Sequence, residues 1–81
     1  MLQKVTVLGG GGMGTACSIL LSEQSAWNVA LWMRNAAEAE ETGRTRHNRK
    51  YLPEARLPDR IDVTSDAVRA LRGTGLIVVA V

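Results

Sequence analysis

Residues 5–16 read VTVLGGGGMGTA, and this stretch decides the fold of the chain. The β-branched run at residues 5–8 is typical of a buried strand, whereas the residues after the glycines are typical of a helix. The pattern G-x-G-x-x-G fits in one register only, with its glycines at Gly9, Gly11 and Gly14. A register that began at Gly10 would need glycine where Thr15 stands. The sequence therefore predicts a strand, a tight glycine loop and a helix, in that order.

Each glycine of the pattern has a distinct use in a loop that binds a dinucleotide. Gly9 permits a tight turn, Gly11 lets the pyrophosphate approach the backbone, and Gly14 lets the helix pack closely on the strand. The N-terminus of the helix then faces the phosphates, where its N–H groups and its dipole favour an anion. A flexible glycine linker is the alternative, but the strand before the loop and the helix after it favour dinucleotide binding.

Length and charge limit the classes of protein that this chain can belong to. Its 81 residues are enough for one small domain. Ten Lys and Arg residues against eight Asp and Glu residues give a formal charge of +2, and six of the ten basic residues lie at positions 44–60. Tyr51 is the one aromatic residue among them, so a solvated loop or contacts with cofactor phosphates are favoured over a nucleic-acid surface. We expect no nucleic-acid partner.

Cysteine usage and hydropathy indicate the compartment. Cys17 is the single cysteine, so the chain forms no internal disulfide, and we expect a cytoplasmic protein. No apolar run approaches the roughly 20 residues that cross a bilayer, so we expect no membrane span. His47, the single histidine, stands in the basic segment and is expected to be solvated rather than catalytic. We find no pattern of metal ligands.

The periodicity of the apolar residues predicts the elements of the first half. Residues 13–23 form a predicted helix with an apolar stripe at positions 13, 16, 17, 20 and 21. Residues 27–33 are an apolar strand that should be covered on both faces. A second helix is expected at residues 36–42, with Asn35 as its N-cap and Gly43 at its end.

In the second half, the basic segment 44–60 contains two prolines and is expected to be mostly loop. A short strand at residues 61–64, a helix at residues 66–72 capped by Ser65, and an apolar strand at residues 75–81 follow. The order β-α-β-α-β-α-β predicts an α/β fold of the Rossmann type. This is a doubly wound parallel sheet with strand order 3-2-1-4, in which residues 1–81 form part of a dinucleotide-binding domain.

Three segments together resemble NAD(P)-dependent glycerol-3-phosphate dehydrogenase. These are the glycine stretch from Lys4 to Ala16, the segment Leu31-Trp32-Met33-Arg34, and the segment Asn48-Arg49-Lys50-Tyr51-Leu52-Pro53 followed by Leu57-Pro58. The resemblance implies an oxidoreductase that uses NAD or NADP to interconvert dihydroxyacetone phosphate and sn-glycerol 3-phosphate for phospholipid synthesis. It also implies a cytoplasmic enzyme.

The resemblance further assigns site residues. Gly12 and Met13 correspond to residues that touch the cofactor, Arg34 to a residue at its adenosine end, and Tyr51 to a further contact. The family's catalytic lysines and substrate-phosphate ligands lie beyond residue 81, in the rest of the cofactor domain and in a helical substrate domain. We therefore expect no catalytic residue in this chain, no turnover by it alone, and a longer enzyme of which it is the N-terminal part.

Two alternatives to this enzyme stay open from the sequence. One is a non-catalytic dinucleotide-binding module, and the other is a different NAD(P)-dependent hydroxyacid or sugar-nucleotide dehydrogenase. The segment Tyr51-Leu52-Pro53 argues against the second alternative.

Two further expectations concern the cofactor and the assembly. NAD-specific sites usually place an acid about 20 residues after the glycines, where this chain has Met33, Arg34 and Asn35, so NADP is favoured. A contact between the guanidinium of Arg34 and the 2′-phosphate would explain that preference. The apolar strand at residues 76–81 would present an unpaired edge, so we expect a homodimer or aggregation through this strand.

Overall fold

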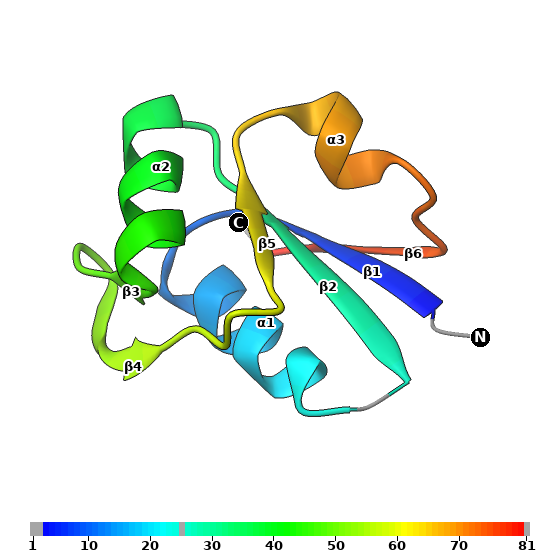
Figure 1. Ribbon diagram of the computed structural model, residues 1–81, viewed down its shortest axis with the longest axis horizontal. Coiled ribbons are helices and arrows are strands. Elements are labelled where there is room, and N and C mark those ends of the chain that lie inside the picture. The colour runs from blue at the N-terminus through cyan, green and yellow to red at the C-terminus, as the bar shows by residue number, and fades with distance from the viewer. Residues whose placement is uncertain (1–2, 25, 81) are drawn as a thin grey trace.

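A parallel sheet with helices on both faces forms the centre of the molecule (Figure 1), described by a computed structural model over residues 3–24 and 26–80. The elements are β1 (Gln3–Leu8), α1 (Gly12–Ser22), β2 (Trp27–Trp32), α2 (Ala36–Thr45), β3 (His47–Asn48), β4 (Leu52–Arg56), β5 (Asp62–Thr64), α3 (Ala67–Leu71) and β6 (Leu76–Val79). Residue 81, the end of the predicted last strand, lies outside the described residues.

The four strands of this sheet have the order β5-β2-β1-β6, and all three neighbouring pairs are parallel. Val7 pairs with Leu31 on one side and with Val78 on the other, so β1 lies between β2 and β6. The α/β class and the predicted order 3-2-1-4 are confirmed. Because the order reverses between β1 and β6, the carboxyl ends of these two strands form the crevice in which doubly wound sheets bind ligands.

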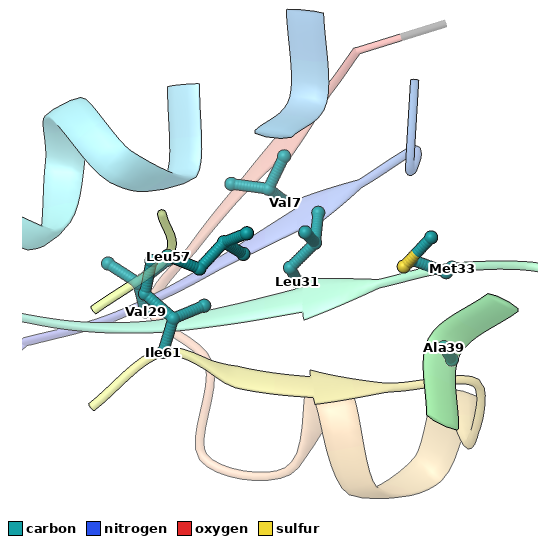
Figure 2. Packing of buried hydrophobic residues seen from close by; sticks show 7 residues of the cluster. All are labelled: Val7, Val29, Leu31, Met33, Ala39, Leu57 and Ile61. Atoms are coloured by element: carbon teal, nitrogen blue, oxygen red, sulfur yellow. The ribbon is translucent and has the colours of Figure 1, made fainter. Parts of the chain in front are cut away.

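Buried aliphatic side chains fill one face of the sheet (Figure 2). Val7, Val29 and Leu31 come from the two central strands, and Leu57 and Ile61 come from the chain between β4 and β5. Leu57 is fully buried, and such burial stabilises a fold by about 1.5–3 kcal/mol per side chain. The segment at residues 44–60, which was predicted to be mostly loop, therefore contributes Leu57 to the hydrophobic core.

Polar contacts hold α3 on the opposite face, below the sheet in Figure 2. The hydroxyl of Thr6 is fully buried and donates to the carbonyl of Ala70 at 2.7 Å. The ammonium of Lys4 donates to the carbonyl of Arg72 at 2.7 Å, close to the end of α3. A cation there satisfies a terminal carbonyl and complements the helix dipole.

The predicted apolar stripe of the first helix is wrong, although the helix itself is confirmed. Met13 is 70% exposed and Leu20 is 64% exposed. The buried residues of α1 are small, namely Gly14, Thr15, Ser18 and Ser22. Small residues let the helix approach the sheet closely, and the hydroxyl of Ser18 donates within the helix to the carbonyl of Gly14 at 2.9 Å. Close packing, rather than apolar periodicity, selects the buried face.

The structure also corrects the end of the second helix. Gly43 does not end α2, which continues to Thr45 and is followed by Arg46 in the left-handed region at φ 63°. A side chain is rarely tolerated there, yet here the guanidinium of Arg46 is bound by several carbonyl groups. It donates to Pro58 and Ile61, each at 2.6 Å, and these contacts hold the strained residue in place.

Residues 44–60 are not mostly loop, because α2 extends to Thr45 and two strands follow it. β3 and β4 form a two-stranded antiparallel sheet with an irregular register, in which His47 pairs with Arg56 and Asn48 pairs with Leu52. Pro53 lies within β4, where its missing N–H is tolerated because the ribbon is short and irregular.

The predicted cap of α3 also differs. Asp66, not Ser65, is the N-cap, and its carboxylate accepts from the N–H groups of Val68 and Arg69. The carbonyl of Ser65 instead accepts from the indole of Trp32.

Candidate functional site

A cleft of about 850 Å³ lies beside the glycine loop, at the carboxyl ends of the central strands. Four parts of the chain line it: the glycine loop, the chain that leaves β2, the turn between β3 and β4, and Ala80 after β6. The lining residues are Gly9, Gly10, Gly11, Gly12, Met13, Trp32, Met33, Arg34, Asn35, Glu38, Lys50, Tyr51 and Ala80. The cleft therefore brings together every predicted site residue except Gly14, which lies at the buried start of α1.

Two glycines of the motif are required by the packing of the chain itself. Gly9 has φ 130°, which side chains rarely adopt, and a Cβ there would overlap the carbonyl of Ala80 after β6. A Cβ on Gly14 would overlap the carbonyl of Gly9. These two positions explain how β1 turns sharply into α1 while the helix stays against the strand.

Gly11 is different, because a Cβ placed on it would meet no described atom within 4 Å. The space beside this residue is open, so packing within the described chain does not account for the glycine. Gly11 is also the N-cap of α1, which in the described residues has no side-chain cap and no acidic residue in its first turn. The first N–H groups of α1 and the open space beside Gly11 fit a phosphate group.

The wall after β2 contains a cation and a carboxylate. Arg34 is exposed and Glu38 is half-buried, and both line the cleft. The side chain of Asn35 caps α2 by accepting from the N–H of Glu38 at 3.0 Å. The indole N–H of Trp32 donates to the carbonyl of Ser65 at 2.9 Å, which fixes this ring at the cleft wall.

The third wall is the turn between β3 and β4, where Tyr51 and Lys50 line the cleft. The ammonium of Lys50 lies 5.1 Å from the centre of the Tyr51 ring. Tyr51 raises the pKa of Lys50, first through a hydrogen bond to its side chain and second through charge attraction. Lys50 therefore brings a positive charge to this wall of the cleft.

Sequence reasoning gave no role to Asn48, and it favoured a solvated loop for Lys50. Asn48 is buried, and its amide reaches the glycine loop from β3. The available signal was its place in the Asn48 to Pro53 segment, but that segment was predicted to be a loop. Without the β3–β4 pair, nothing in the sequence placed either side chain beside the glycines.

A second hollow, of about 380 Å³, lies between α2 and β5 and is lined largely by charged residues. Four of its charged residues, Arg46, Asp59, Asp62 and Arg69, are already bound within the protein. Arg69 pairs with Asp62, Arg56 donates to Asp59 at 2.8 Å, and Arg46 is held by carbonyl groups. Burial lowers the pKa of Arg46 despite the nearby carboxylate of Asp59. This hollow is less suited to an anionic ligand than the glycine cleft.

Neither a metal site nor a membrane helix is found in the described part of the chain. Across residues 3–24 and 26–80, no three His, Cys, Asp or Glu side chains are grouped so that they could hold a metal ion. No helix within those ranges has the length and apolar character needed to cross a membrane.

Comparison with known proteins identifies a family. The model for the N-terminus of NAD-dependent glycerol-3-phosphate dehydrogenase matches residues 4–81. A glycerol-3-phosphate dehydrogenase (NAD(P)+) of Lysinibacillus sphaericus is 41% identical over 80 residues, which are 99% of this chain and 23% of that protein. Its counterpart in Pseudomonas entomophila is 44% identical over 78 residues, which are 96% of this chain and 23% of that protein.

Solved structures give the same result for the fold. Glycerol-3-phosphate dehydrogenase from Coxiella burnetii superposes with a TM-score of 0.88 at 26% identity, over 96% of this chain and 24% of that chain. The enzyme from Saccharomyces cerevisiae superposes with a TM-score of 0.86 at 25% identity, over all of this chain and 26% of that chain. The present chain therefore spans about a quarter of the length of these relatives.

Proposed function

This chain belongs to the NAD-dependent glycerol-3-phosphate dehydrogenase family, whose N-terminal part it matches, and from that premise we propose that its cleft binds NAD or NADP. The single observation that carries the proposal is Gly11. It has open space beside it at the N-terminus of α1, which no side chain caps in the described residues. A dinucleotide pyrophosphate is the ligand that this arrangement fits.

In this proposal the pyrophosphate lies against the loop from Gly9 to Gly12, and the first N–H groups of α1 bind it. Met13 and Tyr51 contact the cofactor from the start of the helix and from the hairpin, and Gly14 keeps the helix close to the strand. Their places around one cleft support these roles, because all except Gly14 line it. The bound nicotinamide would supply the hydride chemistry, and the chain supplies binding and orientation.

The proposed reaction is the interconversion of dihydroxyacetone phosphate and sn-glycerol 3-phosphate, for phospholipid synthesis, in the cytoplasm. It rests on the names of the relatives, which are NAD(P)+-dependent glycerol-3-phosphate dehydrogenases, and on the family match. These 81 residues correspond to about a quarter of the relatives, so we expect them to bind the cofactor without turnover. Acid–base groups for the carbonyl would come from outside residues 1–81.

A homodimer is a further part of the proposal. In these 81 residues taken alone, β6 is at one edge of the described sheet, and Ile77 and Val79 on it are 49% and 64% exposed. An apolar strand edge of this kind can pair with a second copy.

We further propose that the cofactor is NADP rather than NAD, and that Arg34 recognises its 2′-phosphate. Arg34 lines the cleft just after β2, where its guanidinium could bind a 2′-phosphate. Glu38 lines the same wall and would favour ribose hydroxyls instead. The two side chains therefore support opposite preferences, and titration of the purified protein with NADPH and NADH decides between them.

Arg34→Ala should weaken NADPH binding by about 1–3 kcal/mol, the scale of a hydrogen bond to a charged group, and change NADH binding much less. Fluorescence titration of the reduced nucleotides measures both dissociation constants. Arg44→Ala, which removes an exposed arginine that does not line the cleft, is the matched control for net charge. An equal change for both nucleotides would refute the role of Arg34. Failure of the unmutated protein to bind either nucleotide would refute the proposal that the cleft binds a dinucleotide.

A further inference from the structure

Asn48 is the most deeply buried polar side chain of the hairpin, at 2% exposure. Its amide nitrogen donates to the carbonyl of Gly10 at 2.6 Å and to the hydroxyl of Thr15 at 2.8 Å. Its amide oxygen accepts from the N–H of Tyr51 at 3.3 Å. An asparagine amide offers two donors and one acceptor oxygen, and all three functions are used here.

These contacts join two walls of the cleft through one side chain. Gly10 belongs to the glycine loop and Tyr51 to the hairpin turn, and both residues line the cleft. Thr15 is in the first turn of α1, where its N–H bonds to the carbonyl of Gly11. Asn48 is 38 residues from Gly10 in the sequence, so the contact depends on the tertiary fold.

Residues 9–12 of the glycine loop need such support because they have no side chains. Four consecutive glycines have more accessible backbone conformations than any other tetrapeptide, and fixing them is entropically costly. In a planar trans peptide the carbonyl of Gly10 and the N–H of Gly11 point in opposite directions. By binding that carbonyl, Asn48 also fixes the direction of the Gly11 N–H.

We propose that Asn48 is a positioning residue of the dinucleotide site, which holds the glycine loop and the Tyr51 turn in their binding geometry before the cofactor arrives. The inference rests on the proposed dinucleotide binding. A loop that is already ordered loses less conformational entropy on binding, so removing the support weakens affinity even in protein that remains folded.

The test variant is Asn48→Asp, which keeps the shape of the side chain and the oxygen that accepts from Tyr51. It replaces the amide donor with an oxygen, which in the ionised carboxylate cannot donate to the carbonyl of Gly10, so binding is titrated well above the usual carboxyl pKa, at about pH 8. Thr6→Val is the matched control, since it also removes a buried donor to a backbone carbonyl, on the opposite face of the sheet. Both variants should lower the melting temperature.

Binding separates a positioning role from a structural one. NADPH and NADH are titrated at a temperature where circular dichroism shows the proteins to be folded. We expect the dissociation constant of Asn48→Asp to rise about tenfold or more, a change of about 1.4 kcal/mol or more, and that of Thr6→Val to rise less than about twofold. A second variant, Thr15→Val, covers the case in which Asn48→Asp does not fold. It removes only the second acceptor of the Asn48 amide, and it should still weaken binding about threefold while Thr6→Val does not.

The possible failures can be told apart. If the unmutated protein binds neither nucleotide, the proposed dinucleotide site is wrong. If it binds and the folded Asn48→Asp variant binds within twofold of it, the positioning role is wrong and the site stands. The same holds if Asn48→Asp is unfolded and Thr15→Val binds like the unmutated protein.

Discussion

The glycine loop at residues 9–14 and the hairpin segment at residues 46–60 face the same cleft, but they are held in place in different ways. Within the loop, main-chain contacts such as the close approach of Gly14 to the carbonyl of Gly9 set the path of the chain, and the amide of Asn48 adds one side-chain contact from β3. The hairpin segment is held by long side chains that reach distant carbonyl groups, as Arg46 reaches Pro58 and Ile61. Constraints on the main chain involve residues that are close in sequence, so a sequence motif can reveal them. Side-chain contacts between residues that are far apart in sequence leave no such motif.

The largest expected effect comes from a substitution in the glycine loop. Gly14→Ala should destabilise the fold by about 3 kcal/mol or more, at the upper end for overpacking, because the new Cβ would overlap the carbonyl of Gly9. Gly11→Ala should destabilise it by less than about 1 kcal/mol, because its Cβ would meet open space and alanine is only a poorer N-cap than glycine. Urea denaturation measures both changes.

The variants Gly14→Ala and Gly11→Ala also separate the effect of the motif on folding from its effect on nucleotide binding. Gly11→Ala should weaken nucleotide binding about tenfold while the fold survives, since its Cβ would occupy the space assigned to the pyrophosphate. If Gly11→Ala binds normally, the open space beside Gly11 does not receive a phosphate. If Gly14→Ala is as stable as the unmutated protein, the loop is not held by its main chain.

The motif explains why the parallel sheet could be predicted from the sequence. Alternation of apolar strands with helices predicted the order that the structure has, and the glycine register predicted where the cleft lies. The buried face of α1 could not be predicted from apolar periodicity, because close packing on the sheet selects Gly14, Thr15 and Ser18 while Leu20 faces outward.

The candidate site was predictable to the same extent. Gly9 and Gly11 follow from the motif, and Arg34 and Tyr51 follow from the resemblance to a family. Asn48 could not be found, because its partners Gly10 and Thr15 are more than 30 residues away and only the fold brings them together. A single sequence contains no record of such contacts.

The next largest effect comes from a substitution in the hairpin segment, where Arg46 binds several carbonyl groups. Arg46→Met should destabilise the protein by about 2 kcal/mol, because the carbonyl groups of Gly43, Pro58 and Ile61 lose a charged donor. Arg49→Ala, the loss of an exposed arginine of the same segment, should change the free energy of unfolding by less than about 0.5 kcal/mol. Thermal unfolding of both variants measures the difference, and equal effects would contradict an anchoring role for Arg46.

The smallest effect concerns the ion pair of Asp59 and Arg56, which lie 2.8 Å apart on the exposed surface of the hairpin segment. Arg56 lowers the pKa of Asp59, first by a hydrogen bond and second by charge attraction. In the unfolded chain the carboxyl titrates near its usual value of about 3.9. The folded protein therefore holds the charged form more strongly, and the pair stabilises the fold above pH of about 4. That contribution is lost as pH falls through the lowered pKa of the folded state.

Asp59→Asn lacks this contribution at every pH. Its melting temperature should lie slightly and constantly below that of the unmutated protein between pH 5 and 7, and the gap should close as pH falls below about 4. Salt should also narrow the gap at pH 7, because the Debye length is only about 3 Å at 1 M. The gap between Gly11→Ala and the unmutated protein should not change with pH or salt in this way, since no charge is altered. A gap for Asp59→Asn that widens in acid would show that the pair does not stabilise the folded state, and the hairpin segment would then owe its stability to the buried contacts of Arg46 and Leu57 rather than to its surface charges.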